Sequence, residues 1–309
     1  MKKEKILILG GTGFLGKNLI RQLVNKYSID CIHLKKIKNI DLINKINYIK
    51  FNLNHHSKYK KFFNKNYDYI INLSGYIDHD KKIKNIDNIF TEHFLNIYNI
   101  SNFFLNKRIK KFINIGSSDE YGNIKNKNFF ETDREDPISI YSLGKTCSAH
   151  YLRTLYHIYK FPTVTLRIFL AYGPGQDGVR FVPYVINKCL SKKKVIIHNN
   201  FKRDFCYVDD VVQAIILCLK SDKVNGEIFN IGSSTPIRLH YLAKKISFLC
   251  KGGKIIIKSK QKNLRKESKI LVANTIKAKN ILNWKPKIKL DIGLKRTINF
   301  YRSQNNAKY

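Results

Sequence analysis

Two residues of the chain have the types and spacing of an acid/base pair. Tyr141 and Lys145 lie four positions apart, which places both side chains on one face of a helix. An ammonium held near a phenol favours the phenolate, so we expect Lys145 to lower the pKa of Tyr141 and make the phenol usable as an acid/base near neutral pH. The alternative is an accidental match, because the chain has 18 Tyr and is rich in lysine.

Serine hydroxyls upstream favour the catalytic interpretation. Ser117 and Ser118 directly follow the predicted strand Lys111–Ile115 and its next residue Gly116. They are therefore expected at the carboxyl edge of a parallel sheet, where open α/β sheets bind their ligands.

A glycine-rich turn after the first predicted strand, Lys5–Leu9, has the spacing of a phosphate-binding loop. The first glycine permits a tight turn, the second lets backbone N–H groups approach a pyrophosphate, and the third lets helix and strand pack closely. The N-terminus of the following helix offers N–H donors and a positive dipole end to the anion. The residues of this turn expected to bind a dinucleotide are Gly10, Thr12, Gly13, Phe14, Leu15 and Gly16.

The expected cofactor preference follows from the absence of an acidic residue after the second predicted strand. Rossmann units usually carry an acid about 20 residues after the glycines, which binds the ribose hydroxyls. Here the predicted second strand, Cys31–Leu34, is followed by Lys35 and further basic residues. A basic residue suits a 2′-phosphate, so we expect NADP(H) rather than NAD(H), although a lysine is common anywhere in this chain.

Strand-length apolar runs alternate with amphipathic helical stretches, which predicts βαβ units and a parallel sheet covered on both faces. We expect a Rossmann-type doubly wound α/β domain over residues 1–168, with a return at about 206–235. A smaller mixed α/β lobe for substrate is expected over 169–205 and 236–309. The other predicted strands and helices are Tyr69–Leu73, Thr163–Arg167, Glu227–Ile231, Val195–His198, Gly16–Asn25, Asn88–Asn106, Ser142–Tyr159, Phe181–Leu190 and Val208–Lys220.

The composition excludes disorder but leaves the charge to be explained. Hydrophobic residues make up 43% of 309 residues, and 58 Lys+Arg against 22 Asp+Glu give a net charge of +36. Only 11 of the basic residues are Arg, the residue preferred for reading bases and phosphates. We therefore expect solvated lysines and no nucleic-acid partner. No apolar run approaches a membrane span, no His or Cys spacing suggests a metal, and buried free thiols fit a cytoplasmic protein.

Several ordered motifs resemble the extended short-chain dehydrogenase/reductase family, in its nucleotide-sugar branch of epimerases, 4,6-dehydratases and 4-ketosugar reductases. The resemblance covers nearly the whole chain. The matching stretches are Gly10–Gly16, Asn72–Gly75, Gly116–Gly122, Pro137–Lys145, Arg167–Gly175, Arg203–Asp210, Asn230–Ser233 and Leu282–Pro286.

The resemblance implies a role for each matching residue. Tyr141 is the expected acid/base at the sugar oxygen, Lys145 the residue that holds the nicotinamide ribose, and Ser117 a hydrogen-bond partner of the same oxygen, with Ser118 as the alternative. The expected cofactor contacts also include Leu73, Ser74 and Gly75, and the expected substrate contacts Asp119, Arg203 and Arg265. The two arginines would bind the substrate diphosphate, which suits a guanidinium fork. A homodimer is a further expectation from the resemblance.

The sequence also departs from the family pattern. Asn52 and Leu53 stand where an acid near adenine is frequent, so we expect an altered contact there. Leu170 replaces a common substrate-binding Asn. Asp119 and Glu120 lie one position late for the acid pair of a dehydratase, so dehydration is not indicated.

These observations support NADPH reduction of a 4-keto-6-deoxy sugar nucleotide as the leading hypothesis. A 4-epimerase with tightly bound cofactor would use the same residues, and a 4,6-dehydratase is the more distant enzyme alternative. A non-catalytic Rossmann-like protein that binds nucleotides or RNA is the alternative of another class.

Overall fold

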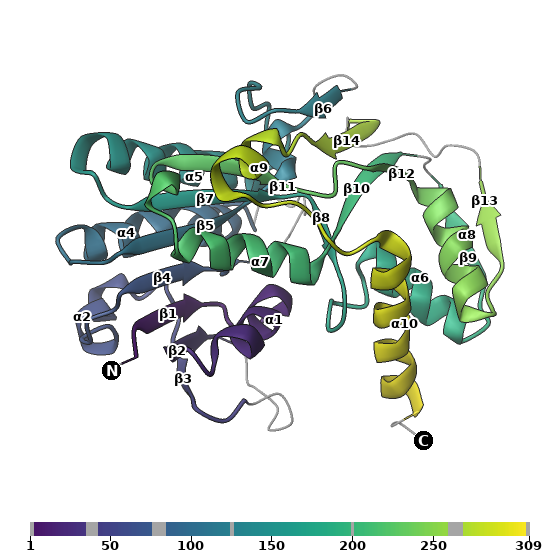
Figure 1. Cartoon of the computed structure of the whole chain (residues 1–309), viewed down its shortest axis with the longest axis horizontal. Helices are drawn as coiled ribbons and strands as arrows, with labels where there is room; N and C mark the ends of the chain where they lie inside the picture. The colour runs from purple at the N-terminus through teal and green to yellow at the C-terminus, as the bar shows by residue number, and fades with distance from the viewer. Residues whose placement is uncertain are drawn as a thin grey trace.

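The computed structural model describes residues 3–34, 43–75, 85–123, 127–198, 201–258 and 268–306. Its largest element is a seven-stranded sheet in which every neighbouring pair is parallel (Figure 1). In spatial order the strands are β11 (Glu227–Ile231), β7 (Thr163–Ile168), β5 (Lys111–Ser117), β4 (Tyr69–Asn72), β1 (Lys5–Leu9), β2 (Ser28–His33) and β3 (Ile46–Lys50).

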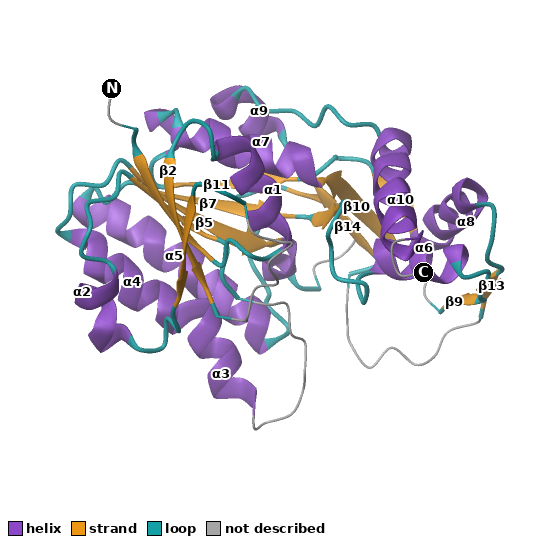
Figure 2. Ribbon diagram, turned by 90° about the horizontal axis from the view of Figure 1, so that it is seen from below, coloured by secondary structure: helices purple, strands orange, loops and turns teal. Residues whose placement is uncertain are grey.

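Helices cover both faces of this sheet because its strands are apolar on both sides. Ile6 and Ile8 of β1 pack in one hydrophobic cluster, whereas Leu7 and Leu9 pack in a second cluster on the opposite face. Figure 2 shows the sheet nearly edge-on between its two helical layers. One layer contains α1 (Phe14–Leu23), α7 (Val208–Leu219) and α9 (Ile276–Leu282), and the other contains α2 (Tyr59–Phe62), α3 (Ile86–Phe90), α4 (Asn96–Leu105) and α5 (Ile140–Tyr159). The predicted doubly wound α/β fold is confirmed.

The remaining elements form smaller sheets and a helical group at one end of the molecule, away from β1–β3 (Figure 1). One sheet has the order β12 (Pro236–Arg238), β10 (Lys202–Tyr207), β14 (Ile270–Ala273) and β6 (Lys127–Phe129), and β8 (Leu170–Tyr172) pairs with β10. A second pairs β13 (Ile255–Ile257) with β9 (Val195–Ile197). The helices of this end are α6 (Phe181–Leu190), α8 (Leu239–Cys250) and α10 (Leu290–Asn306).

Most predicted elements are shifted by one or two residues at an end, and two of them differ more from the structure. The second strand begins at Ser28 and ends at His33, rather than covering 31–34. The helix predicted over 88–106 is divided by a π-helical turn, Thr91–Leu95, which lies between α3 and α4. The edge strand β3 escaped prediction because its residues are mixed polar and apolar and none is fully buried.

The cysteines are all free thiols, as expected, and five are buried while Cys147 is half-buried. Within the described ranges, no helix is both long enough and apolar enough to span a membrane.

Candidate functional site

A cavity of about 1090 Å³ opens at the carboxyl ends of the central strands. Its walls include Gly10 after β1, Leu73 after β4 and Ser118 after β5. The switch point of the sheet lies between β1 and β4, because the chain runs from β1 to β2 and β3 on one side and then crosses over to β4 and β5 on the other. Such a switch point is the usual ligand site of an open α/β sheet.

Most of the predicted site residues line this cavity. They are Gly10, Gly13, Phe14, Leu15, Gly16, Leu73, Ser74, Gly75, Ser117, Ser118, Asp119, Tyr141, Lys145 and Arg203. Thr12, Asn52 and Leu53 are not part of its lining. Lys35 and Arg265 lie outside the described residues.

The turn between β1 and α1 fits the pyrophosphate of a dinucleotide. Gly10 has a φ of +75°, which favours glycine. Helix α1 begins at Phe14 after Gly13, with no side-chain cap and no acid in its first turn. A side chain on Gly16 would collide with the backbone of Gly11. The first N–H groups of α1 therefore face the cavity without a competing carboxylate, as phosphate binding requires.

Among its described residues, β2 offers no acid that is available to bind the ribose of an adenosine. Asp30 lies inside this strand and is 3% exposed. Its carboxylate accepts hydrogen bonds from Tyr67 at 2.7 Å, Asn47 at 2.9 Å and Lys65 at 3.0 Å. Asp30 is therefore buried within the sheet, and its carboxylate is engaged with these three side chains.

The two residues expected near adenine differ in their environments. Asn52 is half-buried, and its side-chain oxygen accepts from the backbone N–H of Asn54 at 3.0 Å. Leu53 is 7% exposed and packs in the second hydrophobic cluster. Leu53 therefore serves the core, and the structure does not bring either side chain into the cavity.

The loop after β4 is held in place by a buried amide. Asn72 is fully buried and donates to Asn114 at 2.8 Å. The side-chain oxygen of Asn72 accepts hydrogen bonds from the hydroxyl of Ser74 at 2.5 Å and from the backbone N–H of Ser74 at 3.2 Å. This bonding presents Ser74 and Gly75 to the cavity.

Tyr141 and Ser117 come together in the lining of the cavity. Helix α5 is started by a capping box in which the side chains of Ser139 and Ser142 bond each other's backbone N–H at 3.1 and 3.0 Å. This cap places Tyr141 in the first turn, where it is 4% exposed and hydrogen-bonded to the Ser117 side chain. Ser118 also lines the cavity and is 2% exposed.

The pKa of Tyr141 differs from the expectation. Burial, with the nearby Asp119 carboxylate, raises this pKa above its ordinary value, while the Ser117 hydrogen bond and Arg180 act to lower it. The expected net lowering of the Tyr141 pKa by Lys145 is therefore wrong. Burial also lowers the pKa of Lys145 to about 8, and its ammonium donates to the Ile115 carbonyl oxygen at 2.7 Å. The desolvation that weakens the charge of Lys145 also disfavours the phenolate.

The two acids after Ser118 have separate roles. Glu120 is fully buried, accepts from the Ser117 N–H at 2.7 Å, and pairs with the equally buried Arg167 at 2.7 Å. Glu135 also pairs with Arg167. Glu120 is therefore part of the scaffold beneath the site, whereas Asp119 lines the cavity, as does Asp177.

Several cavity residues had no usable signal in the sequence. Arg180 precedes α6 and contributes to the electrostatics of Tyr141, and Gln176 and His93 also line the cavity. These residues come from loops and a helix distant in sequence from Tyr141. Arg203, which was predicted, is 8% exposed, and one guanidinium nitrogen donates to the Ser268 carbonyl oxygen at 3.0 Å.

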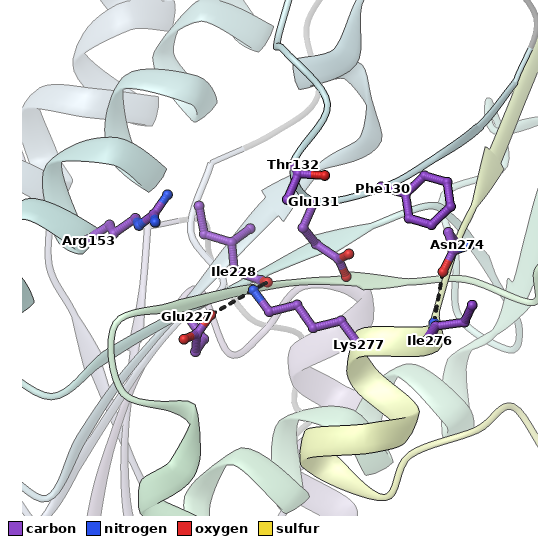
Figure 3. Close-up of a pocket in the computed structure, with 9 residues that line it drawn as sticks. All are labelled: Phe130, Glu131, Thr132, Arg153, Glu227, Ile228, Asn274, Ile276 and Lys277. Atoms are coloured by element: carbon purple, nitrogen blue, oxygen red, sulfur yellow. Dashed lines mark hydrogen bonds and ion pairs between the residues drawn. The ribbon is translucent and has the colours of Figure 1, made fainter.

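A second cavity, of about 360 Å³, contains none of the predicted site residues (Figure 3). Lys277 crosses it and bonds Glu227 at 2.6 Å and the Ile228 carbonyl oxygen at 2.8 Å. Asn274 accepts from the Ile276 N–H at 3.0 Å. The larger cavity therefore carries the candidate chemistry.

Comparison with known proteins agrees with this geometry. The model of the NAD dependent epimerase/dehydratase family matches residues 6–232. The dTDP-4-dehydro-6-deoxyglucose reductase of Escherichia coli is 29% identical over 97% of this chain and 98% of its own. The human dTDP-D-glucose 4,6-dehydratase is 28% identical over 97% of this chain and 90% of its own.

Solved structures share the fold. The UDP-glucose 4-epimerase of Thermotoga maritima, determined with UDP-glucose, has a TM-score of 0.89 and 24% identity, covering 97% of this chain and 99% of its own. The chain thus belongs to the NAD dependent epimerase/dehydratase family, in the extended short-chain dehydrogenase/reductase branch of nucleotide-sugar enzymes, as its motifs predicted.

Proposed function

We propose that the protein reduces a 4-keto-6-deoxy sugar nucleotide with NADPH. The observation that carries the proposal is the state of Tyr141, a buried phenol bonded to Ser117 in the main cavity, whose pKa is raised. A phenol that keeps its proton at neutral pH is suited to donate it to a ketone oxygen. The similarity to a 4-keto sugar reductase over the whole chain supports the same direction.

The side chains of the cavity divide the work of this reaction. A nicotinamide cofactor, when bound, would supply the hydride. Tyr141 delivers the proton to the ketone oxygen, and Ser117 hydrogen-bonds that oxygen. Arg203, at the cavity wall, binds the diphosphate, together with Arg265 on the evidence of the sequence motif.

The preference for NADPH rests on the end of β2. Asp30, the acid within β2, is engaged with Tyr67, Lys65 and Asn47, so it does not bind a ribose hydroxyl or repel a 2′-phosphate. Lys35 follows shortly after the strand in sequence. Replacement of Lys35 by Ala is expected to raise the KM for NADPH but not for NADH.

A 4-epimerase is the second candidate, because it needs the same Tyr141, Ser117 and Lys145. The engagement of Glu120 with Arg167 and with the Ser117 N–H argues against a dehydratase, which would need both acids after Ser118 to face the substrate. The proposed assembly is a homodimer formed through α4 and α5, which expose Tyr98, Ile158 and Tyr159.

The test is turnover by the purified protein. It is incubated with dTDP-4-keto-6-deoxyglucose and with UDP-glucose, each with NADPH, with NADH and without added cofactor, and products are identified by mass spectrometry and NMR. Stoichiometric consumption of NADPH supports the proposal. Sugar interconversion without added reductant establishes the epimerase instead, and RNA binding that persists at physiological salt without any turnover establishes the non-catalytic alternative.

A further inference from the structure

His93 lies beside the catalytic tyrosine on an irregular piece of helix. It belongs to the π-helical turn Thr91–Leu95, is 2% exposed and lines the main cavity. A π-turn widens the helix by one residue, which changes the direction of the side chains it carries, and such turns occur frequently at functional sites. His93 is therefore placed by a departure from regular helix.

The imidazole of His93 packs edge-to-face against the ring of Tyr141. The ring centroids are 4.7 Å apart and the planes meet at 88°. This is a preferred arrangement for two aromatic rings. The contact restrains the side of Tyr141 that Ser117 does not hold.

Two glycines leave the space that the imidazole fills. A Cβ on Gly75 would lie 2.5 Å from Cε1 of His93, and a Cβ on Gly144 would lie 2.8 Å from Cβ of His93. Gly75 belongs to the loop after β4, and Gly144 is the third residue after Tyr141 on α5. Any side chain at either position would displace His93 from Tyr141.

A hydrogen bond joins the π-turn to the helix that carries Tyr141. The hydroxyl of Ser148 donates to the carbonyl oxygen of His93 and lies 2.9 Å from the carbonyl oxygen of Gly144. Ser148 is buried and lies two helical turns beyond Tyr141. The backbone of His93 therefore keeps its place relative to α5, and its ring keeps its place relative to Tyr141.

We propose that His93 is a positioning residue, which holds the ring of Tyr141 so that its hydroxyl stays on Ser117 and faces the substrate cavity. The kinetic consequence rests on the proposed function of the site. Misplacement of a catalytic group by about 1 Å costs about 100-fold in rate. His93→Ala is therefore expected to lower kcat by about this factor and to leave the KM for the sugar nucleotide nearly unchanged, because Arg203 is untouched.

The first test does not depend on turnover. NMR of protein labelled in its tyrosine rings is recorded, with the Tyr141 signals assigned by their loss in Tyr141→Phe. His93→Ala is expected to shift these signals and to speed the flipping of the ring. Tyr27→Leu is the matched control, because Tyr27 makes an edge-to-face pair with Tyr69 at 5.9 Å and 89°, outside the cavity. Unchanged Tyr141 signals in His93→Ala overturn the proposal, whatever the activity.

The second test separates the ring from its nitrogens. His93→Phe keeps a planar ring and is expected to recover most of the kcat lost in His93→Ala. Gly144→Ala leaves every cavity side chain in the protein but pushes against His93, so it should lower kcat without raising KM. If His93→Phe is as slow as His93→Ala and Gly144→Ala is as fast as wild type, ring positioning is refuted. If the wild type turns over no sugar nucleotide, the proposed function is refuted, whereas the NMR experiment still tests whether His93 positions the ring of Tyr141.

Discussion

The buried ammonium of Lys145 predicts a pH-dependent stability that one substitution should remove. Lys145 is 6% exposed, and burial lowers its pKa from 10.5 to about 8 in the folded protein. The folded protein therefore releases this proton near pH 8, whereas the unfolded chain keeps it to about pH 10.5. Because the unfolded state binds more protons between these values, Lys145 makes the free energy of unfolding rise with pH in this window.

The magnitude follows from the same values. The difference between 10.5 and about 8 corresponds to about 3 kcal/mol, which is the cost of the buried charge below pH 8. Lys145→Met removes that cost. It also removes the hydrogen bond of 2.7 Å to the Ile115 carbonyl oxygen, and leaving this buried acceptor unpaired costs about 1–3 kcal/mol of stability. At pH 7 the two effects largely offset each other. Between pH 7 and pH 9.5 the loss of the Lys145 proton raises the free energy of unfolding of the wild type by about 2 kcal/mol, and the variant lacks this increase.

Urea unfolding of nucleotide-free wild type and Lys145→Met at pH 7.0 and 9.5 measures this difference. Subtracting one protein from the other removes the contributions of the other titrating groups. Lys244→Met, at an exposed position on α8, serves as the control and should change the free energy of unfolding by less than about 0.5 kcal/mol at both values. A wild-type-minus-variant difference that is equal at pH 7.0 and 9.5 would refute the reasoning.

Three further substitutions test the site and its scaffold. Tyr141→Phe should lower kcat by about 10²–10⁴-fold with unchanged circular dichroism and thermal midpoint; activity near that of wild type would remove Tyr141 from the acid/base role. Glu120→Ala leaves the buried guanidinium of Arg167 with less compensation and should destabilise the fold by about 3–5 kcal/mol in urea unfolding, whereas a small effect would mean that Glu135 alone neutralises Arg167. Arg203→Lys loses the planar fork that suits a diphosphate and should raise the KM for the sugar nucleotide by about 10-fold at nearly constant kcat; a fall in kcat at constant KM would contradict the binding role.

Local chemistry made much of the nucleotide-binding half predictable. The run Lys5–Leu9 followed by the glycine turn encodes strand, turn and helix within about 20 residues, and the structure has β1 and α1 there. The period of a single helix places Tyr141 and Lys145 on the same face of α5, which is also a local property. Ser117 was expected at the carboxyl end of a buried strand, and it is the last residue of β5.

The sequence was less informative about elements that depend on distant partners. The edge strand β3 has no continuous apolar run, and it forms because β2 offers an unpaired edge. The π-turn at His93 is irregular helix, which the helical pattern of residues 88–106 did not reveal. Its position follows from contacts with Gly75, Gly144 and Ser148 on other segments.

The sequence alone determined the family, the fold class and the residue types of the site, because these depend on spacings of a few residues. Tertiary structure alone decided which of the two acids after Ser118 lines the cavity and in which direction the pKa of Tyr141 is shifted. Glu120 forms an ion pair with Arg167, which is 47 residues away in the sequence, while Asp119 lines the cavity. Burial raises the pKa of Tyr141 against the expectation from its helical spacing with Lys145. The physical reason is that desolvation and buried ion pairs depend on everything that surrounds a group in space, and neighbours in sequence are a small part of those surroundings.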